Sequence, residues 1–90
     1  MKRSKLSEII RHKIATVKGL QESSITAESC IRDDLGISSM DFITILTDVA
    51  MVLGIDLMKF SEREIVTVLT VGDLERSFAS KLPQQGEKND

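Results

Sequence analysis

One stretch decides the fold, Asp33-Asp34-Leu35-Gly36-Ile37-Ser38-Ser39-Met40-Asp41-Phe42, where a polar loop ends and a long apolar run begins. Ser38 is a good helix cap with Asp41 three residues later, so the pattern predicts a helix from about Ser39 to Leu53, stopped by Gly54. We interpret Ser39 as the residue that offers its hydroxyl to solvent as a handle for covalent attachment. A helix N-terminus would tolerate a phosphorylated adduct there, because its amide groups and dipole favour an anion.

Helical spacing recurs on the N-terminal side of this stretch. Ser4 or Ser7 is expected to cap a first helix that ends at Gly19. Its buried face is predicted to consist of Leu6, Ile9, Ile10, Ile14 and Val17. Residues 20–32 then read as a long ordered loop, which two apolar anchors, Ile25 and Ile31, hold against the core.

Two further helices are predicted after Gly54. Ser61-Glu62-Arg63-Glu64 has the spacing of a capping box and should begin a short helix that runs through Leu69. Thr70-Val71-Gly72-Asp73 repeats that signal and begins a final helix that ends before Pro83. The buried face of this final helix is predicted to consist of Val71, Leu74, Phe78 and Leu82. The fold class is therefore all-α, a small four-helix bundle of three longer helices and one short helix.

Composition indicates a single small domain. The 90 residues are too few for two hydrophobic cores. The chain has three phenylalanines but neither tryptophan nor tyrosine, so the core is expected to be packed mainly by aliphatic side chains. The single cysteine, Cys30, cannot form an internal disulfide, and charges interrupt the N-terminal segment, so we expect a cytoplasmic protein without a signal peptide. No segment is apolar for long enough to span a membrane.

Charge is unevenly distributed, although the formal net charge is only −2. Six lysines and arginines face only Glu8 in the first twenty residues, whereas residues 33–58 hold five aspartates and neither lysine nor arginine before Met58. The central segment is expected to project a negative field that suits a basic partner surface, unless these are ordinary solvated faces. Nucleic acid is not an expected partner, because the acidic middle would repel phosphates.

The sequence lacks the residue sets that common enzymes use. His12 is the only histidine, and we interpret it as a solvated surface residue rather than a general base. Without a second cysteine or histidine, no zinc site is expected. Gly36-Ile37-Ser38 begins like a nucleophile elbow, but Met40 occupies the place of the second glycine. We therefore expect a protein that is modified on serine rather than an enzyme.

The run Asp34-Leu35-Gly36-Ile37-Ser38-Ser39-Met40-Asp41 resembles the modification motif of acyl carrier proteins. Gly54-Ile55-Asp56-Leu57 and Thr70-Val71-Gly72-Asp73-Leu74 are similar to later segments of that family. The resemblance covers roughly Leu6 to Phe78, and implies a carrier domain over residues 1–82. Residues 83–90 are expected to form a disordered tail, because from Gln84 onward the chain is polar and lacks apolar anchors. The resemblance also implies that Ser39 receives 4′-phosphopantetheine from coenzyme A, with Ser38 as the alternative attachment residue.

The same resemblance implies which partners the chain meets. They are a phosphopantetheinyl transferase and enzymes that transfer or modify acyl groups carried as thioesters, with the carrier itself a monomer. The expected docking residues lie at and after the attachment serine, namely Ser38, Met40, Asp41, Thr44, Asp48 and Met51. For Met51 we favour a role in filling the core over docking, because methionine commonly fills core gaps. A bound acyl chain could enter between helices lined by Ile45, Leu46, Val49 and Ile65.

Two departures from the family pattern bear on the cargo. Ser38 stands where the family usually has aspartate, and Met40 stands where it usually has leucine. The second predicted helix also lacks the glutamates typical of fatty-acid carriers. These differences favour a specialised fatty acid, lipid or polyketide pathway. The alternatives are an aminoacyl carrier of the D-alanyl or peptidyl type, and a helical protein-interaction adaptor that is never modified.

Overall fold

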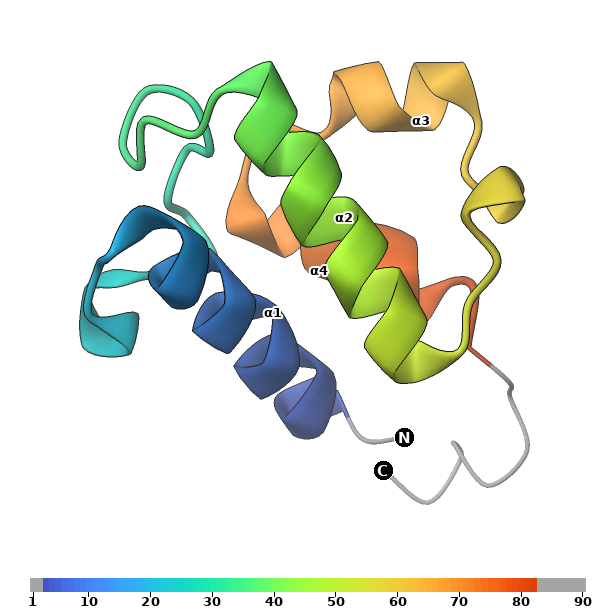
Figure 1. The fold of residues 1–90 in the computed structure, drawn as a ribbon, viewed down its shortest axis with the longest axis horizontal. Helices are drawn as coiled ribbons and strands as arrows, with labels where there is room; N and C mark the ends of the chain where they lie inside the picture. Colours follow the sequence, from blue (N-terminus) through green and yellow to red (C-terminus); the bar gives the residue numbers. More distant parts are fainter. Residues whose placement is uncertain (1–2, 83–90) are drawn as a thin grey trace.

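The computed structural model describes residues 3–82, and within this range four α-helices pack around one hydrophobic core (Figure 1). The helices are α1 (Arg3–Lys18), α2 (Ser39–Leu53), α3 (Glu62–Thr67) and α4 (Val71–Ala79). Two short 3₁₀ helices, η1 (Glu22–Ser24) and η2 (Leu57–Lys59), lie in the connections. This confirms the expected all-α bundle of three longer helices and one short helix. The predicted tail, 83–90, lies outside the described residues.

The core is formed mainly by α1, α2 and α4. Both α2 and α4 contact α1. The predicted face of α4 is confirmed, because Val71, Leu74 and Phe78 are all almost fully buried. Phe78 packs edge-on against Phe60 with 4.9 Å between ring centroids, and Phe42 is buried as well, so all three phenylalanine rings lie in this core. From α1, the core receives Leu6, Ile10 and Ile14.

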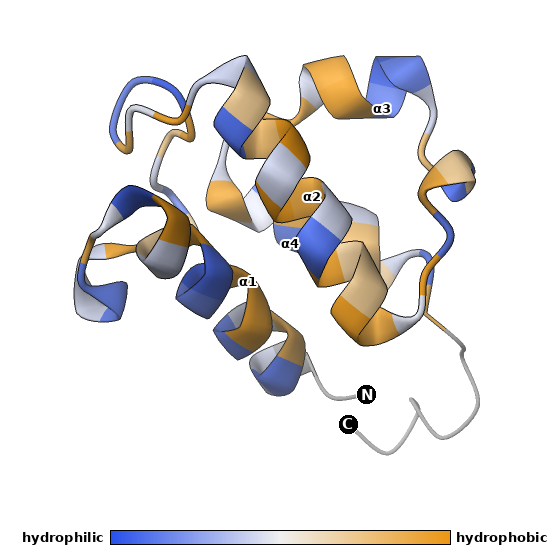
Figure 2. Ribbon diagram, in the orientation of Figure 1, coloured by the Kyte–Doolittle hydropathy of each residue, from blue (hydrophilic) through white to orange (hydrophobic). Residues whose placement is uncertain are grey.

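Helix α2 has the predicted bounds because both of its ends carry strong local signals. The Ser38 side chain accepts a hydrogen bond from the Asp41 backbone N–H at 3.1 Å, as expected for an N-cap. At the other end Gly54 adopts φ +70°, a left-handed conformation that residues with a Cβ rarely tolerate. Figure 2 shows hydrophobic colour along most of α2, although only one side of the helix faces the core.

The long loop between α1 and α2 is ordered, with both predicted anchors, Ile25 and Ile31, in the core. Its backbone is joined to the segment that links α3 and α4 and to the first turn of α4. Ile31 N–H donates to the Leu69 carbonyl at 2.9 Å, and Gly72 N–H donates to the Ala27 carbonyl at 2.9 Å. These bonds satisfy backbone groups that would otherwise be orphaned on burial, and they fix the loop that leads to Ser39.

Two boundary predictions are wrong. Helix α1 already includes Arg3, so Ser4 and Ser7 lie within it rather than capping it, and the Ser7 hydroxyl instead donates to Glu75 at 2.9 Å. Helix α3 ends at Thr67 rather than reaching Leu69, because the chain must turn extended to pair with the loop before α4 begins. Both predicted capping boxes, at Ser61 and Thr70, are present.

Candidate functional site

The turn before α2 delivers Ser39 to the surface. Gly36 adopts φ +64°, which reverses the chain without steric cost, and its N–H donates to the Arg32 carbonyl at 3.1 Å. The next residue, Ile37, is buried and anchors the turn in the core. The chain then leaves the core, so that Ser38 and Ser39 are both exposed.

The two serines have different roles in this geometry. The Ser38 hydroxyl is occupied as the N-cap of α2, where it accepts from the Asp41 N–H. Ser39 is the first residue of the helix, and its hydroxyl oxygen accepts a hydrogen bond from Arg32 Nη2 at 3.3 Å. Within residues 3–82 no histidine or carboxylate hydrogen-bonds to Ser39, so deprotonation of its hydroxyl would need a base from another molecule.

The acidic groups of α2 are paired with lysines of α1. Asp41 lies 3.3 Å from Lys18 Nζ, and Asp48 lies 3.4 Å from Lys13 Nζ. Partly exposed pairs of this kind contribute little to stability, but they reduce the net charge that α2 presents to a partner. The negative field expected from the central segment is therefore partly cancelled by the basic first helix.

Apolar side chains instead dominate the exposed part of α2. Met40 is 80% exposed and Ile43 is 51% exposed. Met51 is 75% exposed, so the expectation that it fills the core is wrong. These residues recur at helical spacing with exposed Thr44, along the side of α2 that α1 and α4 leave uncovered. Ile43 was missing from the docking residues named by sequence, although the three- and four-residue spacing from Met40 and Met51 would have included it.

A hollow of about 150 Å³ opens beside the start of α2. Phe42 of α2 and Ile65 of α3 line it, together with Ile31, Arg32, Val66, Val68 and Leu69. Among the residues suggested as walls for an acyl chain, Ile65 lines this hollow, whereas Ile45, Leu46 and Val49 are buried in the core behind it. Helix α3 contributes no fully buried residue, and its Ile65 packs against the core only partly buried.

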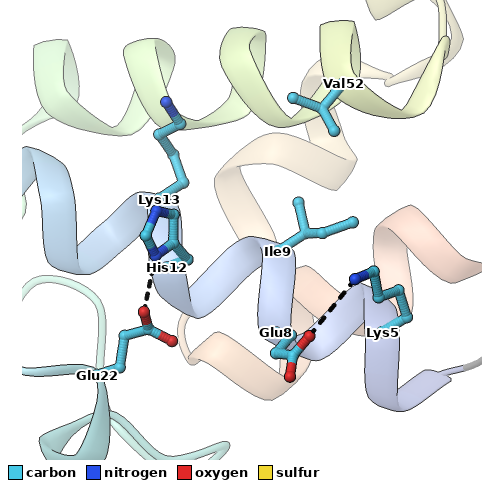
Figure 3. A pocket seen from close by; sticks show the side chains of 7 residues that line it. All are labelled: Lys5, Glu8, Ile9, His12, Lys13, Glu22 and Val52. Carbon is cyan, nitrogen blue, oxygen red and sulfur yellow. Dashed lines mark hydrogen bonds and ion pairs between the residues drawn. The ribbon is translucent and has the colours of Figure 1, made fainter.

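A larger hollow, about 480 Å³, lies elsewhere, between α1 and the C-terminal half of α2 (Figure 3). Four of its charged groups pair with one another, since His12 Nδ1 is 2.7 Å from Glu22 and Lys5 Nζ is 3.7 Å from Glu8, whereas Lys13 pairs with Asp48. His12 is exposed, as expected from the sequence. In residues 3–82 no group of three or more histidine, cysteine, aspartate and glutamate side chains is placed to hold a metal ion.

Cys30 lies nine positions before Ser39 in the chain but is poorly suited to react. Burial raises the pKa of its thiol, and the neighbouring Asp34 and Asp33 carboxylates raise it further. The thiolate is the reactive form of cysteine, so this thiol is kept in its unreactive state near neutral pH. Among residues 3–82 no helix is both long and apolar enough to cross a membrane.

Comparison with known proteins identifies the family. No protein-family model matches the sequence. Over 79 residues the chain is 32% identical to the acyl carrier protein of Thermotoga maritima, an alignment that covers 88% of this chain and 89% of the relative. A solved structure of the acyl carrier protein from Enterococcus faecalis superimposes with a TM-score of 0.72 at 18% identity, covers 90% of this chain and 99% of its own, and so supports the fold. The chain belongs to the acyl carrier protein family.

Proposed function

We propose that this chain carries acyl groups as thioesters on a 4′-phosphopantetheine arm attached to Ser39. The observation that carries this proposal is the unequal use of the serine pair, because Ser38 is occupied as a helix cap while Ser39 presents an exposed hydroxyl. The surroundings fit the group, since Arg32 places a cation beside the oxygen that would bear the phosphodiester. When attached, the arm supplies a terminal thiol that holds the acyl group.

Ser39 is the nucleophile in the attachment reaction. Its Oγ forms a bond to the phosphorus that bears the pantetheine of coenzyme A, the pyrophosphate bond breaks, and adenosine 3′,5′-bisphosphate leaves. The hydroxyl proton passes to a base of the transferase, since no such base contacts Ser39 within residues 3–82. The chain itself contributes position, and the partner enzymes contribute the catalytic groups.

Intact mass after incubation with coenzyme A and a broad-specificity phosphopantetheinyl transferase tests this proposal. The wild type and Ser38→Ala should gain one phosphopantetheine, and Ser39→Ala should gain none. An unmodified wild type would instead favour the adaptor function, and an adduct lost only in Ser38→Ala would move the attachment to that residue. Loading the modified protein with fatty acyl or aminoacyl groups by their respective ligases would then separate the fatty acid, lipid or polyketide pathways from the aminoacyl alternative.

Partner enzymes are proposed to dock on an apolar stripe of α2, which consists of Met40, Ile43, Thr44 and Met51. Its support is the exposure of these side chains. The other three residues in the predicted docking set, Ser38, Asp41 and Asp48, already make intramolecular bonds. We therefore infer that this carrier is recognised more by apolar contact than by charge, which agrees with a specialised pathway.

The transferase serves as a probe of this docking stripe. Met40→Ser and Met51→Ser should raise the KM of the transferase for the carrier. Met58→Ser is the matched control, because Met58 is 87% exposed but lies on η2, outside the stripe. Equal effects of all three substitutions would contradict docking on the stripe, as would a KM that rises steeply with salt.

The acyl chain is proposed to enter the hollow between α2 and α3 first. At about 150 Å³ the hollow has the volume of roughly five liquid water molecules, so a longer chain requires α3 to move outward. The absence of buried residues on α3 makes this the least costly wall to displace. Nuclear magnetic resonance of acylated against unacylated carrier should show shifts at Phe42 and Ile65, and shifts confined to Ser39 and its neighbours would exclude sequestration.

A further inference from the structure

Arg32 is held beside the attachment serine by the backbone of its own loop. The Arg32 carbonyl accepts from the Gly36 N–H at 3.1 Å, and the Cys30 carbonyl accepts from the Asp34 and Leu35 N–H groups. These bonds fold residues 30–36 into a compact turn that directs the Arg32 side chain toward α2. Its Nη2 donates to Ser39 Oγ at 3.3 Å, although the two residues are seven positions apart.

The guanidinium of Arg32 is available to an anion. Most cations in the described range have a carboxylate partner within 4.0 Å, namely Lys5, Arg11, Lys13, Lys18, Arg76 and Lys81. Arg32 has none among residues 3–82, even though Asp33 and Asp34 follow it directly. The Asp34 carboxylate instead accepts from the Cys30 backbone N–H at 2.8 Å. The bond to Ser39 is the only side-chain hydrogen bond recorded for Arg32 in this range.

We propose that Arg32 binds the phosphodiester of the arm, an inference that rests on the attachment to Ser39 proposed above. A phosphodiester on Ser39 Oγ carries one negative charge on two non-bridging oxygens, which match the fork of a guanidinium. These oxygens would lie two bonds beyond Ser39 Oγ, the atom that Arg32 already contacts. Phosphate binding by Arg32 would therefore require little movement of the loop.

This contact determines the direction in which the arm leaves the protein. Arg32 also lines the hollow formed with Phe42, Ile65 and Leu69. A phosphate held by Arg32 brings the base of the arm to the side of Ser39 nearest this hollow. The opposite direction, along the exposed stripe of α2, is then left open for a partner enzyme. Arg32 acts as a positioning residue for the cargo and not as a catalytic one.

The test compares the side-chain N–H signals of Arg32 in the unmodified and the phosphopantetheine-loaded protein by nuclear magnetic resonance. Intact mass first establishes that the arm is attached. The Arg32 Nε–H should then shift, and its exchange with water should slow by about two- to fivefold, the range expected for an exposed ion pair. High salt should reverse most of this protection, because screening weakens exposed pairs. Arg63, which is also exposed and without a carboxylate partner in the described range, should be unaffected.

Phosphorus resonances of loaded variants provide the second measurement. Arg32→Gln should shift the phosphodiester signal, and Arg32→Lys should shift it less because a point charge remains. Lys59→Gln is the matched control, because Lys59 is exposed and lies on η2, which follows the far end of α2 (Figure 1). Attachment of the arm without any change at Arg32 would overturn this inference alone, as would equal phosphorus shifts in Arg32→Gln and Lys59→Gln. Failure of the wild type to gain the arm would overturn the proposed function and this inference with it.

Discussion

Ser38→Ala should destabilise the unmodified protein, whereas Ser39→Ala should not. Ser38→Ala removes the acceptor of the 3.1 Å bond from the Asp41 N–H, and loss of a serine N-cap costs about 1 kcal/mol. For a domain of this size, that loss lowers the melting temperature by about 4–8 °C. Ser39 is exposed at the first helical position, where alanine has the better helix propensity, so the change in Ser39→Ala should stay within about 0.5 kcal/mol.

Urea unfolding followed by circular dichroism measures this difference directly. With a slope of about 1–2 kcal/mol per molar urea, the midpoint of Ser38→Ala should fall by about 0.5–1 M. Ser38→Asp should restore the midpoint, because aspartate caps a helix about as well as serine. Equal losses in Ser38→Ala and Ser39→Ala would refute the division between cap and attachment residue. A lower urea midpoint in Ser39→Ala with an unchanged midpoint in Ser38→Ala would exchange the roles assigned to the two serines.

Three further predictions concern stability at acid pH, the backbone conformation at Gly36 and the exposed position of Met51. Hydrogen bonds hold the pKa of Asp73 below its ordinary value, and bonds from Lys81 and Ser77 do the same for Glu64 against the opposing effect of burial. Below about pH 5 the unfolded chain therefore binds more protons than the folded protein, so the free energy of unfolding should fall as the pH drops from 5 toward 3. Urea unfolding across this range should show a less steep fall for Glu64→Gln than for the wild type. Gly36→Ala should cost about 1–2 kcal/mol in the same assay, because φ is +64° and no atom lies within 4 Å of the added Cβ to add a clash. Met51→Gln should leave the melting temperature nearly unchanged, whereas a loss of 2 kcal/mol or more would return Met51 to the core.

Local signals made most of the secondary structure predictable. The cap at Ser38, the glycine at Gly54 and the two capping boxes each act within four residues, so the start or end of a helix can be read from the chain alone. The start of α1 was predicted wrongly because a local signal was present but did not decide where the helix begins. Ser4 and Ser7 have the chemistry of caps, but α1 already includes Arg3, so both serines lie within the helix.

The surface of the site could not be predicted in the same way. Whether Met51 is buried depends on which side of α2 the other helices cover, and periodicity does not give that when apolar residues surround most of the helix. The Lys13–Asp48 pair joins residues 35 positions apart, and it follows only from the placement of α1 along α2. The contact of Arg32 with Ser39 depends on a folded turn whose side-chain directions the sequence does not specify.

The backbone bonds that join the first loop to the start of α4 have a consequence for biosynthesis. Ile31 and the residues before it find their partners at Leu69, Val71 and Gly72, some forty positions later in the chain. A nascent chain that has emerged only through α2 already contains Ser39 but lacks the partners that hold the loop beside it. Since domains fold as units during synthesis, the setting of Ser39 is completed only when nearly the whole domain has left the ribosome.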